Sequence, residues 1–286
     1  MNVALIYDEL TKRCVGNYVA AALRELGVPF THFWTREAYA IPDTFDLYFR
    51  VDEGIYEYDI PSYLRPSAYW PLDTHLKYPY KKITKIAARY DVVFCPQKSD
   101  VENLKRVCRR VRWIPVGCDP RIHNRVDVKE EYDVGFVGTD GGVPRKFYLQ
   151  EIRERYPHSF IGMIDHTRMN EVYSRSKIGF QYIRSYFTNK SVITQRLFEI
   201  AACGAMILTN HGEEDALAQL GFIDRKNMVV YHNAHELFHS ITYYLTHDEE
   251  RRRIADAGHR LVMQEHTYVR RVAEMLGYID KHISKQ

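Results

Sequence analysis

The chain of 286 residues alternates short apolar stretches with amphipathic ones, and this alternation runs through the sequence twice. In the first round the apolar stretches have the length of buried strands and cover residues 3–7, 47–51, 68–72, 92–95 and 111–116. Helical patterns at 17–26, 81–89 and 100–109 lie between them. Strands alternating with helices indicate a parallel sheet with helices on both faces.

A polar stretch at residues 119–131 interrupts the pattern, and we expect it to link two domains. The second round then predicts strands at 134–137, 160–163, 178–183, 205–208 and 228–231. It predicts helices at 145–156, around 170–174, around Glu199, and at 234–245, 248–264 and 268–283. The chain is therefore expected to be an α/β protein with two doubly wound units in tandem, which bind ligands beyond the carboxyl ends of their strands.

Composition narrows the class of protein. A net charge of +3 and a pI near 8.4 are too mild to indicate nucleic acid by themselves, but they suit an anionic ligand such as a nucleotide diphosphate. The five cysteines are an odd number without a C-x-x-C pair, which favours a reducing compartment over a disulfide framework. Since no apolar run reaches 18 residues, we expect a cytoplasmic protein without an integral membrane contact.

The most informative segment is QRLFEIAACGAMILTN, residues 195–210. Its first half has an apolar face at helical spacing, Gly204 suits a helix end, and an apolar run then predicts a buried strand. Arg196 and Glu199 lie one turn apart on that helix. They either pair on the surface, which contributes only a few tenths of a kcal/mol, or both point to a ligand.

This segment resembles the donor-site signature of GT-B-fold glycosyltransferases, in which a Glu in an E-A-x-A-C-G-like helix binds the ribose of a nucleotide sugar. Glu199 stands at that position, ahead of the AACG run at 201–204. More narrowly, the chain resembles the spore-maturation-type, glycosyltransferase-like group through its R-L-F-E run at 196–199. Further matching stretches lie at residues 70–75, 90–101, 113–123, 133–139 and 266–272.

The resemblance implies a GT-B fold, with two Rossmann-like domains facing each other across a cleft. Residues 1–122 would form the acceptor domain, residues 130–267 the nucleotide-sugar domain, and a last helix at about 268–286 would pack back onto the first. The implied enzyme is a hexosyltransferase-type glycosyltransferase that uses a nucleotide-diphosphate sugar, UDP-sugar by preference, and needs no cofactor. Its acceptor would be a glycan, a protein or a modified nucleic acid; the oligomeric state is open.

A glycine-rich loop, VGTDGGVPRK at residues 137–146, leads from a predicted strand into a predicted helix. Glycines let the backbone approach phosphates closely, and a helix N-terminus adds partial positive charge. Gly138 and Thr139 would therefore line a diphosphate site, with Arg145 and Lys146 adding formal charge. The alternative is a plain turn with solvated charges.

Other candidate donor contacts are weaker. Asn189 and Lys190 stand with Arg196 around the start of the Glu199 helix, where they could hold the β-phosphate or the sugar. Ser191 replaces a Glu of the larger retaining families, which leaves the stereochemistry open. Gly16 follows the first strand, and a tight turn is as good an explanation there as a phosphate or sugar contact.

Asp73 and His75 end the strand-like WPLDTH run and are candidate general bases for an acceptor hydroxyl. Asp52 and Glu53, after the 47–51 strand, are the competing pair. Each carboxylate could instead cap a turn or helix, and a retaining enzyme could work without a protein base.

The run His235-Glu236-Leu237-Phe238-His239 matches the H-E-x-x-H zinc motif and names an alternative, a zinc metallopeptidase. The helix that carries it has the apolar face of an ordinary surface helix in an α/β unit, which favours a structural role. Since no D-x-D occurs, we expect no metal site, with basic residues stabilising the leaving group instead. A catalytically silent sugar-nucleotide binder is the third alternative.

Overall fold

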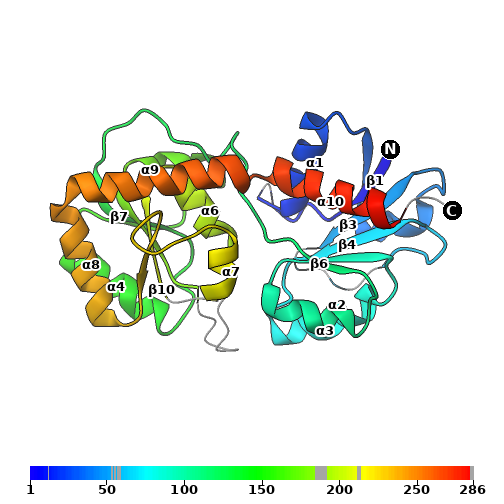
Figure 1. Ribbon diagram of the computed structural model, residues 1–286, viewed down its shortest axis with the longest axis horizontal. Coiled ribbons are helices and arrows are strands. Elements are labelled where there is room, and N and C mark those ends of the chain that lie inside the picture. The colour runs from blue at the N-terminus through cyan, green and yellow to red at the C-terminus, as the bar shows by residue number, and fades with distance from the viewer. Residues whose placement is uncertain are drawn as a thin grey trace. The chain divides into compact units, whose positions relative to one another are not determined.

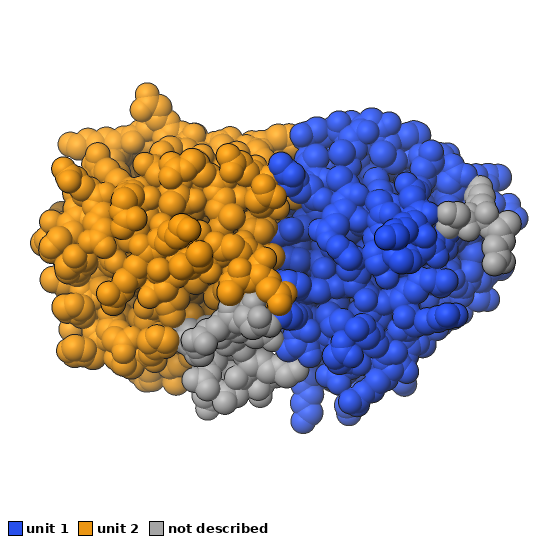
Figure 2. Space-filling view, in the orientation of Figure 1, with its two compact units in different colours: residues 1–116, 268–286 blue, residues 117–267 orange. Residues whose placement is uncertain are grey.

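The computed structural model describes residues 1–11, 13–52, 54, 56, 59–183, 192–210 and 214–283, the side chains of Glu214 and Asp215 excepted. The chain divides into two compact units, shown in blue and orange in Figure 2. The first comprises Met1–Val116 and Tyr268–Gln286, and the second Gly117–Thr267. The polar stretch expected to link two domains thus belongs to the second unit.

A parallel six-stranded sheet in the order β2-β1-β3-β4-β5-β6 forms the centre of the first unit (Figure 1). The strands are β1 (Val3–Ile6), β2 (Phe30–Phe33), β3 (Leu47–Asp52), β4 (Ser67–Pro71), β5 (Val92–Cys95) and β6 (Val111–Trp113). Its helices are α1 (Val15–Glu25), α2 (Lys77–Ala87), α3 (Val101–Lys105) and α10 (Tyr268–His282), with 3-10 turns at Thr35–Ala40 and Lys98–Asp100. Figure 1 shows α1 and α10 on one face of the sheet and α2 and α3 on the other.

The second unit has a parallel five-stranded sheet in the order β11-β10-β9-β7-β8. The strands are β7 (Tyr132–Val137), β8 (Phe160–Gly162), β9 (Ser176–Gln181), β10 (Met206–Asn210) and β11 (Val229–Tyr231). The helices are α4 (Arg145–Arg155), α5 (Met169–Ser174), α6 (Gln195–Ala202), α7 (Glu214–Gln219), α8 (Ala234–Thr246) and α9 (Asp248–Glu265), with a 3-10 turn at His166–Arg168.

These elements confirm the predicted α/β class and its parallel sheets. The pattern missed β2, an edge strand whose four residues are all at least partly exposed and so lack an apolar signature. It also missed α7 and overextended α3, which ends at Lys105 instead of 109. Among the described helices, none combines the length and apolar character that a membrane span requires.

The second unit begins at Gly117 because the chain packs tightly from that point onward. A side chain at Gly117 would collide with the carbonyl oxygen of His266, within the same unit. Asp119 and His123 are buried, at 4% and 0% exposure, and Val126 N–H donates to Ser174 Oγ at 3.1 Å. The boundary therefore lies before the polar stretch and not at residue 122, because polarity alone does not distinguish a linker from a hydrogen-bonded loop.

Candidate donor and acceptor sites

The carboxyl edge of the second sheet brings two helix starts together. The loop after β7 leads into α4, whose first residue is Arg145, and α6 begins one residue before Arg196. Both arginines are half-buried beside Phe136, the last residue but one of β7. Their guanidinium carbons lie 5.8 Å (Arg145) and 4.8 Å (Arg196) from the centre of its ring.

Each arginine is held in place by a hydrogen bond from its Nε. Arg145 Nε donates to the carbonyl of Asp140 at 3.1 Å, and Arg196 Nε donates to the carbonyl of Val137 at 3.1 Å. Among the described residues, no hydrogen bond engages the terminal nitrogens of either guanidinium group. Paired, preoriented guanidinium groups are well suited to phosphate oxygens.

Two glycines make room for these arginines. Gly138 has φ +149° and Gly141 has φ +60°, conformations that L side chains rarely adopt. A Cβ at Gly138 would collide with Arg196 Nη2, and one at Gly141 would collide with the Arg145 guanidinium. The glycine-rich loop therefore shapes the arginine pair.

The pair concentrates positive charge. Burial, followed by the nearby charge of Arg196, lowers the pKa of Arg145. Neither arginine forms an ion pair with a carboxylate among the residues that the structure describes. An anion with two or more charges would relieve the repulsion between the two groups.

The remaining candidates are either exposed to solvent or outside the described residues. Thr139 and Lys146 are exposed. Asn189 and Lys190 lie outside the described residues, as does Glu53 of the acceptor candidates.

Glu199 is completely buried, and its Oε1 lies 3.5 Å from His123 Nε2. The backbone N–H of Asp119 donates to His123 Nδ1 at 3.0 Å, so Nδ1 carries no proton. The ring is then neutral and bears its proton on Nε2, facing the carboxylate. Glu199 does not pair with Arg196 on the surface, because the carboxylate is inside the unit.

Sequence reasoning did not single out three polar groups near this edge. Val137 N–H donates to the hydroxyl of buried Tyr173 at 3.2 Å, and burial raises the pKa of that tyrosine to about 12. Gln181 Nε2 donates to Thr194 Oγ1 at 2.6 Å. Gln181 Oε1 and Gln195 Nε2 are buried without a hydrogen-bond partner in the described part of the chain. Only Gln195 lay within a recognised motif.

In the first unit, Asp73 and His75 follow β4 and are partly exposed. The hydroxyl of Tyr56 donates to Asp73 Oδ2 at 2.8 Å. This hydrogen bond orients the carboxylate of a partly exposed side chain.

Asp52, at the end of β3, is only 2% exposed. It accepts hydrogen bonds from Arg50 Nη2 at 2.7 Å and the Tyr69 hydroxyl at 3.1 Å. Burial raises the pKa of Asp52 to about 7, although the charge of Arg50 opposes that shift. Arg50 is itself wholly buried and lies 3.4 Å from Asp59 Oδ1. Asp52 is thus part of an internal charged network.

Gly16 lies beneath the Tyr7 ring, and any side chain at that position would overlap the ring. The Tyr7 hydroxyl donates to Asn17 Oδ1 at 2.7 Å. Close packing against Tyr7 thus explains why this position requires a glycine, independently of any ligand.

The family model described as "Glycosyl transferase-like" matches residues 121–277, more than half of the chain. The chain belongs to the glycosyl transferase-like family. No curated protein matches it in sequence.

Solved structures share the fold of this glycosyl transferase-like chain. An α-glucosyltransferase solved with UDP and a 13-mer DNA containing a HMU base has a TM-score of 0.70 at 11% identity, over 98% of this chain and 99% of that one. HepE from Anabaena, solved with UDP, has a TM-score of 0.66 at 10% identity, over 98% of this chain and 100% of that one. Sucrose-phosphate synthase from Thermosynechococcus elongatus has a TM-score of 0.64 at 11% identity, over 98% of each chain. The resemblance to GT-B glycosyltransferases is thereby confirmed.

In this glycosyl transferase-like chain the H-E-x-x-H run is part of a helix cap. Asn233 Oδ1 accepts from Glu236 N–H at 2.9 Å, while Glu236 Oε2 accepts from His232 N–H at 2.9 Å. His235 and His239 are exposed, and in the described ranges no three metal-ligating side chains converge. The zinc alternative is set aside, because the family is a glycosyltransferase family and the capping bonds already engage the glutamate.

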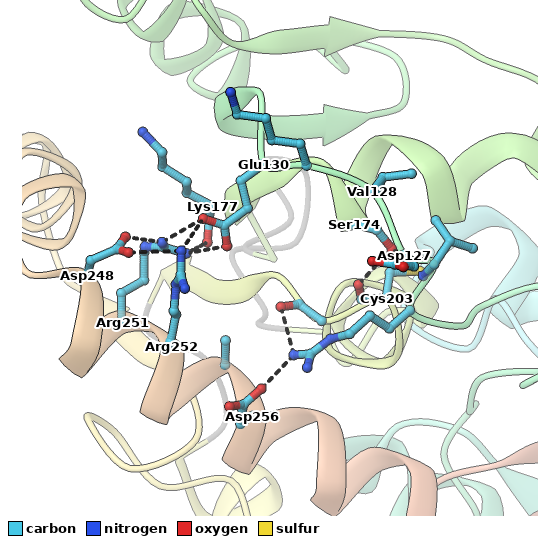
Figure 3. Close-up of a pocket in the computed structure, with 15 residues that line it drawn as sticks. Asp127, Val128, Glu130, Ser174, Lys177, Cys203, Asp248, Arg251, Arg252 and Asp256 are labelled. Atoms are coloured by element: carbon cyan, nitrogen blue, oxygen red, sulfur yellow. Dashed lines mark hydrogen bonds and ion pairs between the residues drawn. The ribbon is translucent and has the colours of Figure 1, made fainter.

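A cavity of about 970 Å³ lies elsewhere in the second unit, beside the amino ends of β9 and β10 (Figure 3). Figure 3 shows Arg251 and Arg252 directed at Glu130 and Asp248. Arg251 Nη2 lies 2.9 Å from Glu130 Oε2, and Arg252 Nη2 lies 3.0 Å from Asp248 Oδ2. Charges that neutralise one another hold helix α9 in place, in contrast to the arginine pair.

Proposed function

We propose that the protein transfers a sugar from a UDP-sugar to an acceptor hydroxyl, with the donor in the second unit and the acceptor in the first. The observation that carries this proposal is the Arg145–Arg196 pair on Phe136, at the carboxyl edge of a parallel sheet. Ligands of such sheets bind at that edge. Family membership supplies the reaction class, and the arginine pair supplies a site for the diphosphate.

During transfer, the bond between the anomeric carbon and the β-phosphate oxygen breaks, and its electron pair leaves with UDP. Arg145 and Arg196 stabilise the charge that develops on that leaving group. Two fixed guanidinium groups can do the work that a divalent cation does in other enzymes. The proposal is therefore a metal-independent enzyme of the hexosyltransferase type, with no cofactor besides the donor.

The neighbouring structures support UDP as the nucleotide, since HepE was solved with UDP and with UDP-glucose, and the α-glucosyltransferase with UDP. Glu199 would bind the ribose, as its motif predicts. Because its carboxylate is wholly buried beside His123, this contact requires the side chains that cover it to move. The spore-maturation-type assignment and a cytoplasmic location, where the five buried thiols stay reduced, complete the proposal.

For the acceptor, Asp73 is the better base of the two carboxylates that the structure describes. It is partly exposed and oriented by Tyr56, whereas Asp52 is enclosed by Arg50 and Tyr69. In an inverting reaction Asp73, or His75 beside it, takes the acceptor proton as the new glycosidic bond forms. In a retaining reaction the departing phosphate can take that proton.

The proposal is tested by titrating the protein with a panel of UDP-sugars in a calorimeter, with EDTA present, and by assaying transfer with the sugar that binds. We expect binding that survives EDTA and weakens in Arg145→Ala and Arg196→Ala. Glu199→Ala should weaken binding by more than about 1 kcal/mol if the ribose contact forms. Equal donor affinity in both arginine variants and the wild type would refute the site. Binding without transfer or donor hydrolysis would indicate the silent binder instead.

A further inference from the structure

Positive charge is concentrated in one part of the first unit. Residues 77–113 hold eleven lysines and arginines and three aspartates and glutamates, a net charge of +8. The whole chain carries only +3, so the rest of the sequence is net negative by five charges. The mild overall charge therefore conceals a strongly basic segment, which comprises α2, β5, α3 and β6.

Helix α2 sorts its side chains by face. Ile83, Ile86 and Ala87 are buried in the core. Lys77, Lys81 and Lys85, spaced four residues apart, are exposed and form one line, which we call the lysine stripe. Successive lysines of the stripe are about 6 Å apart along the helix axis. Like charges at this spacing destabilise a helix, so the stripe has no evident benefit for folding.

Neighbouring acids do not neutralise this stripe. Ion pairs of the basic segment join Lys105 to Glu102, Arg89 to Asp59 and Arg112 to Glu274. Within the described residues no carboxylate pairs with a lysine of the stripe. Figure 1 shows α3, whose last residue is Lys105, on the same face of the sheet as α2.

The stripe begins beside the proposed acceptor site. Lys77 is four residues after Asp73 and is the first residue of α2, at the carboxyl edge of β4. Next to it, Tyr78 is 74% exposed, with the Lys82 ammonium 5.5 Å from the centre of its ring. An exposed aromatic ring thus lies in the first turn of α2, on the same helix as the line of cations.

From this arrangement we propose that the acceptor is a nucleic acid, whose phosphates follow the lysine stripe and one of whose bases stacks on Tyr78. The inference rests on the proposed function and specifies its acceptor. A line of lysines matches the linear charge of a phosphodiester backbone, and aromatic rings beside a cationic groove stack bases regardless of sequence. A membrane fits less well, because the apolar face of α2 is already buried in the core and cannot insert into lipid.

The test compares the wild type with Lys77→Glu/Lys81→Glu/Lys85→Glu and with a control of equal charge change, Lys226→Glu/Arg253→Glu/Arg260→Glu. The control residues are exposed and lie in the second unit. Fluorescence anisotropy measures binding to a labelled DNA of about 20 nucleotides, single-stranded and duplex, across a range of salt concentrations. Thermal melting of each variant establishes that it is folded.

We expect the stripe variant to bind DNA at least about tenfold more weakly, and its plot of log affinity against log salt to be shallower by about 2. The control should stay within about twofold of the wild type. Tyr78→Ala should weaken single-strand binding without changing the salt slope, because stacking releases no counterions. A wild type that binds no DNA at low salt, or equal losses in stripe and control variants, overturns the inference.

Two further measurements separate the possible failures. Vesicles of phosphatidylserine and phosphatidylcholine replace DNA in a sedimentation assay, and preference for vesicles over DNA, lost in the stripe variant, would assign the stripe to a membrane and refute the nucleic acid. UDP-sugar affinity is measured on the same wild-type sample. Intact donor binding without DNA binding refutes this inference alone, whereas absent donor binding refutes the proposed function.

Discussion

The two units share a layered plan of parallel strands and helices but use charge differently. The first unit contains 21 basic and 16 acidic residues, a net charge of +5, and the second contains 19 and 21, a net charge of −2. Yet the first unit buries an arginine, Arg50, among carboxylates. In the more acidic second unit, no described carboxylate pairs with Arg145 or Arg196. Net charge therefore does not indicate where a cation is available to a ligand; local pairing does.

The largest expected effect tests the buried arginine. Arg50→Ala removes the buried cation between Asp52 and Asp59, so that Asp52 loses its ionic partner while Asp59 keeps only Arg89. We expect a loss of about 3–5 kcal/mol in the free energy of unfolding, measured by denaturant titration. Arg36→Ala, at an exposed arginine of the same unit, should cost less than about 0.5 kcal/mol. Similar stability of the two variants would mean that the network is not structural.

The second prediction concerns the Arg145–Arg196 pair. Arg196→Ala should leave the free energy of unfolding nearly unchanged but weaken UDP-sugar binding by about 1.5–3 kcal/mol, the value of a hydrogen bond to a charged group. Calorimetry measures the affinity, with Arg153→Ala on α4 as the control. If both variants bind the donor equally well, Arg196 does not contact the diphosphate.

The third prediction uses the pKa of Asp52, which burial raises to about 7. An unfolded aspartate has a pKa of about 3.9, so between these values the folded state holds a proton that the unfolded state has lost. The stabilisation is complete below about pH 4 and is lost as the pH rises through 7. The wild type should therefore lose about 1 kcal/mol per pH unit relative to Asp52→Asn between pH 5 and 7. Parallel profiles would show that Asp52 is ionised throughout.

The smallest effect has the opposite sign and lies in the second unit. A hydrogen bond from Arg251 lowers the pKa of Asp248, so this carboxylate stabilises the fold above the unfolded pKa and ceases to do so as the pH falls through its folded pKa. Because the side chain is half-exposed, we expect Asp248→Asn to cost only a few tenths of a kcal/mol near neutral pH. Acid titrations of both proteins should converge once the pH has fallen below the folded pKa of Asp248. A constant difference at all pH values would contradict the ion pair.

Hydrophobic periodicity was sufficient to predict the parallel α/β class, because buried strands and amphipathic helices leave strong local patterns. Arg145 and Arg196 were donor-site candidates from the glycine-rich loop and the R-L-F-E run. Both lie at helix starts after parallel strands, and such residues meet at one edge of the sheet. Hydrophobic periodicity could not indicate that Glu199 faces His123, because that contact joins residues far apart in sequence. Nor could it indicate that Asp52 is enclosed, because Tyr69, which donates to it, lies on another strand. The sequence also contains a signal for the capping role of Glu236, because Asn233 stands three residues earlier. The match to the zinc motif drew the interpretation away from it.

The guanidinium groups of Arg145 and Arg196 both lie against the ring of Phe136, and this determines which ligands the site selects. Each guanidinium group is attracted to the aromatic face, yet the two groups repel one another. The site therefore favours ligands that carry more negative charge. A nucleoside diphosphate can satisfy both groups, whereas a monophosphate leaves one of them unmatched. UDP should accordingly compete with the donor far better than UMP does.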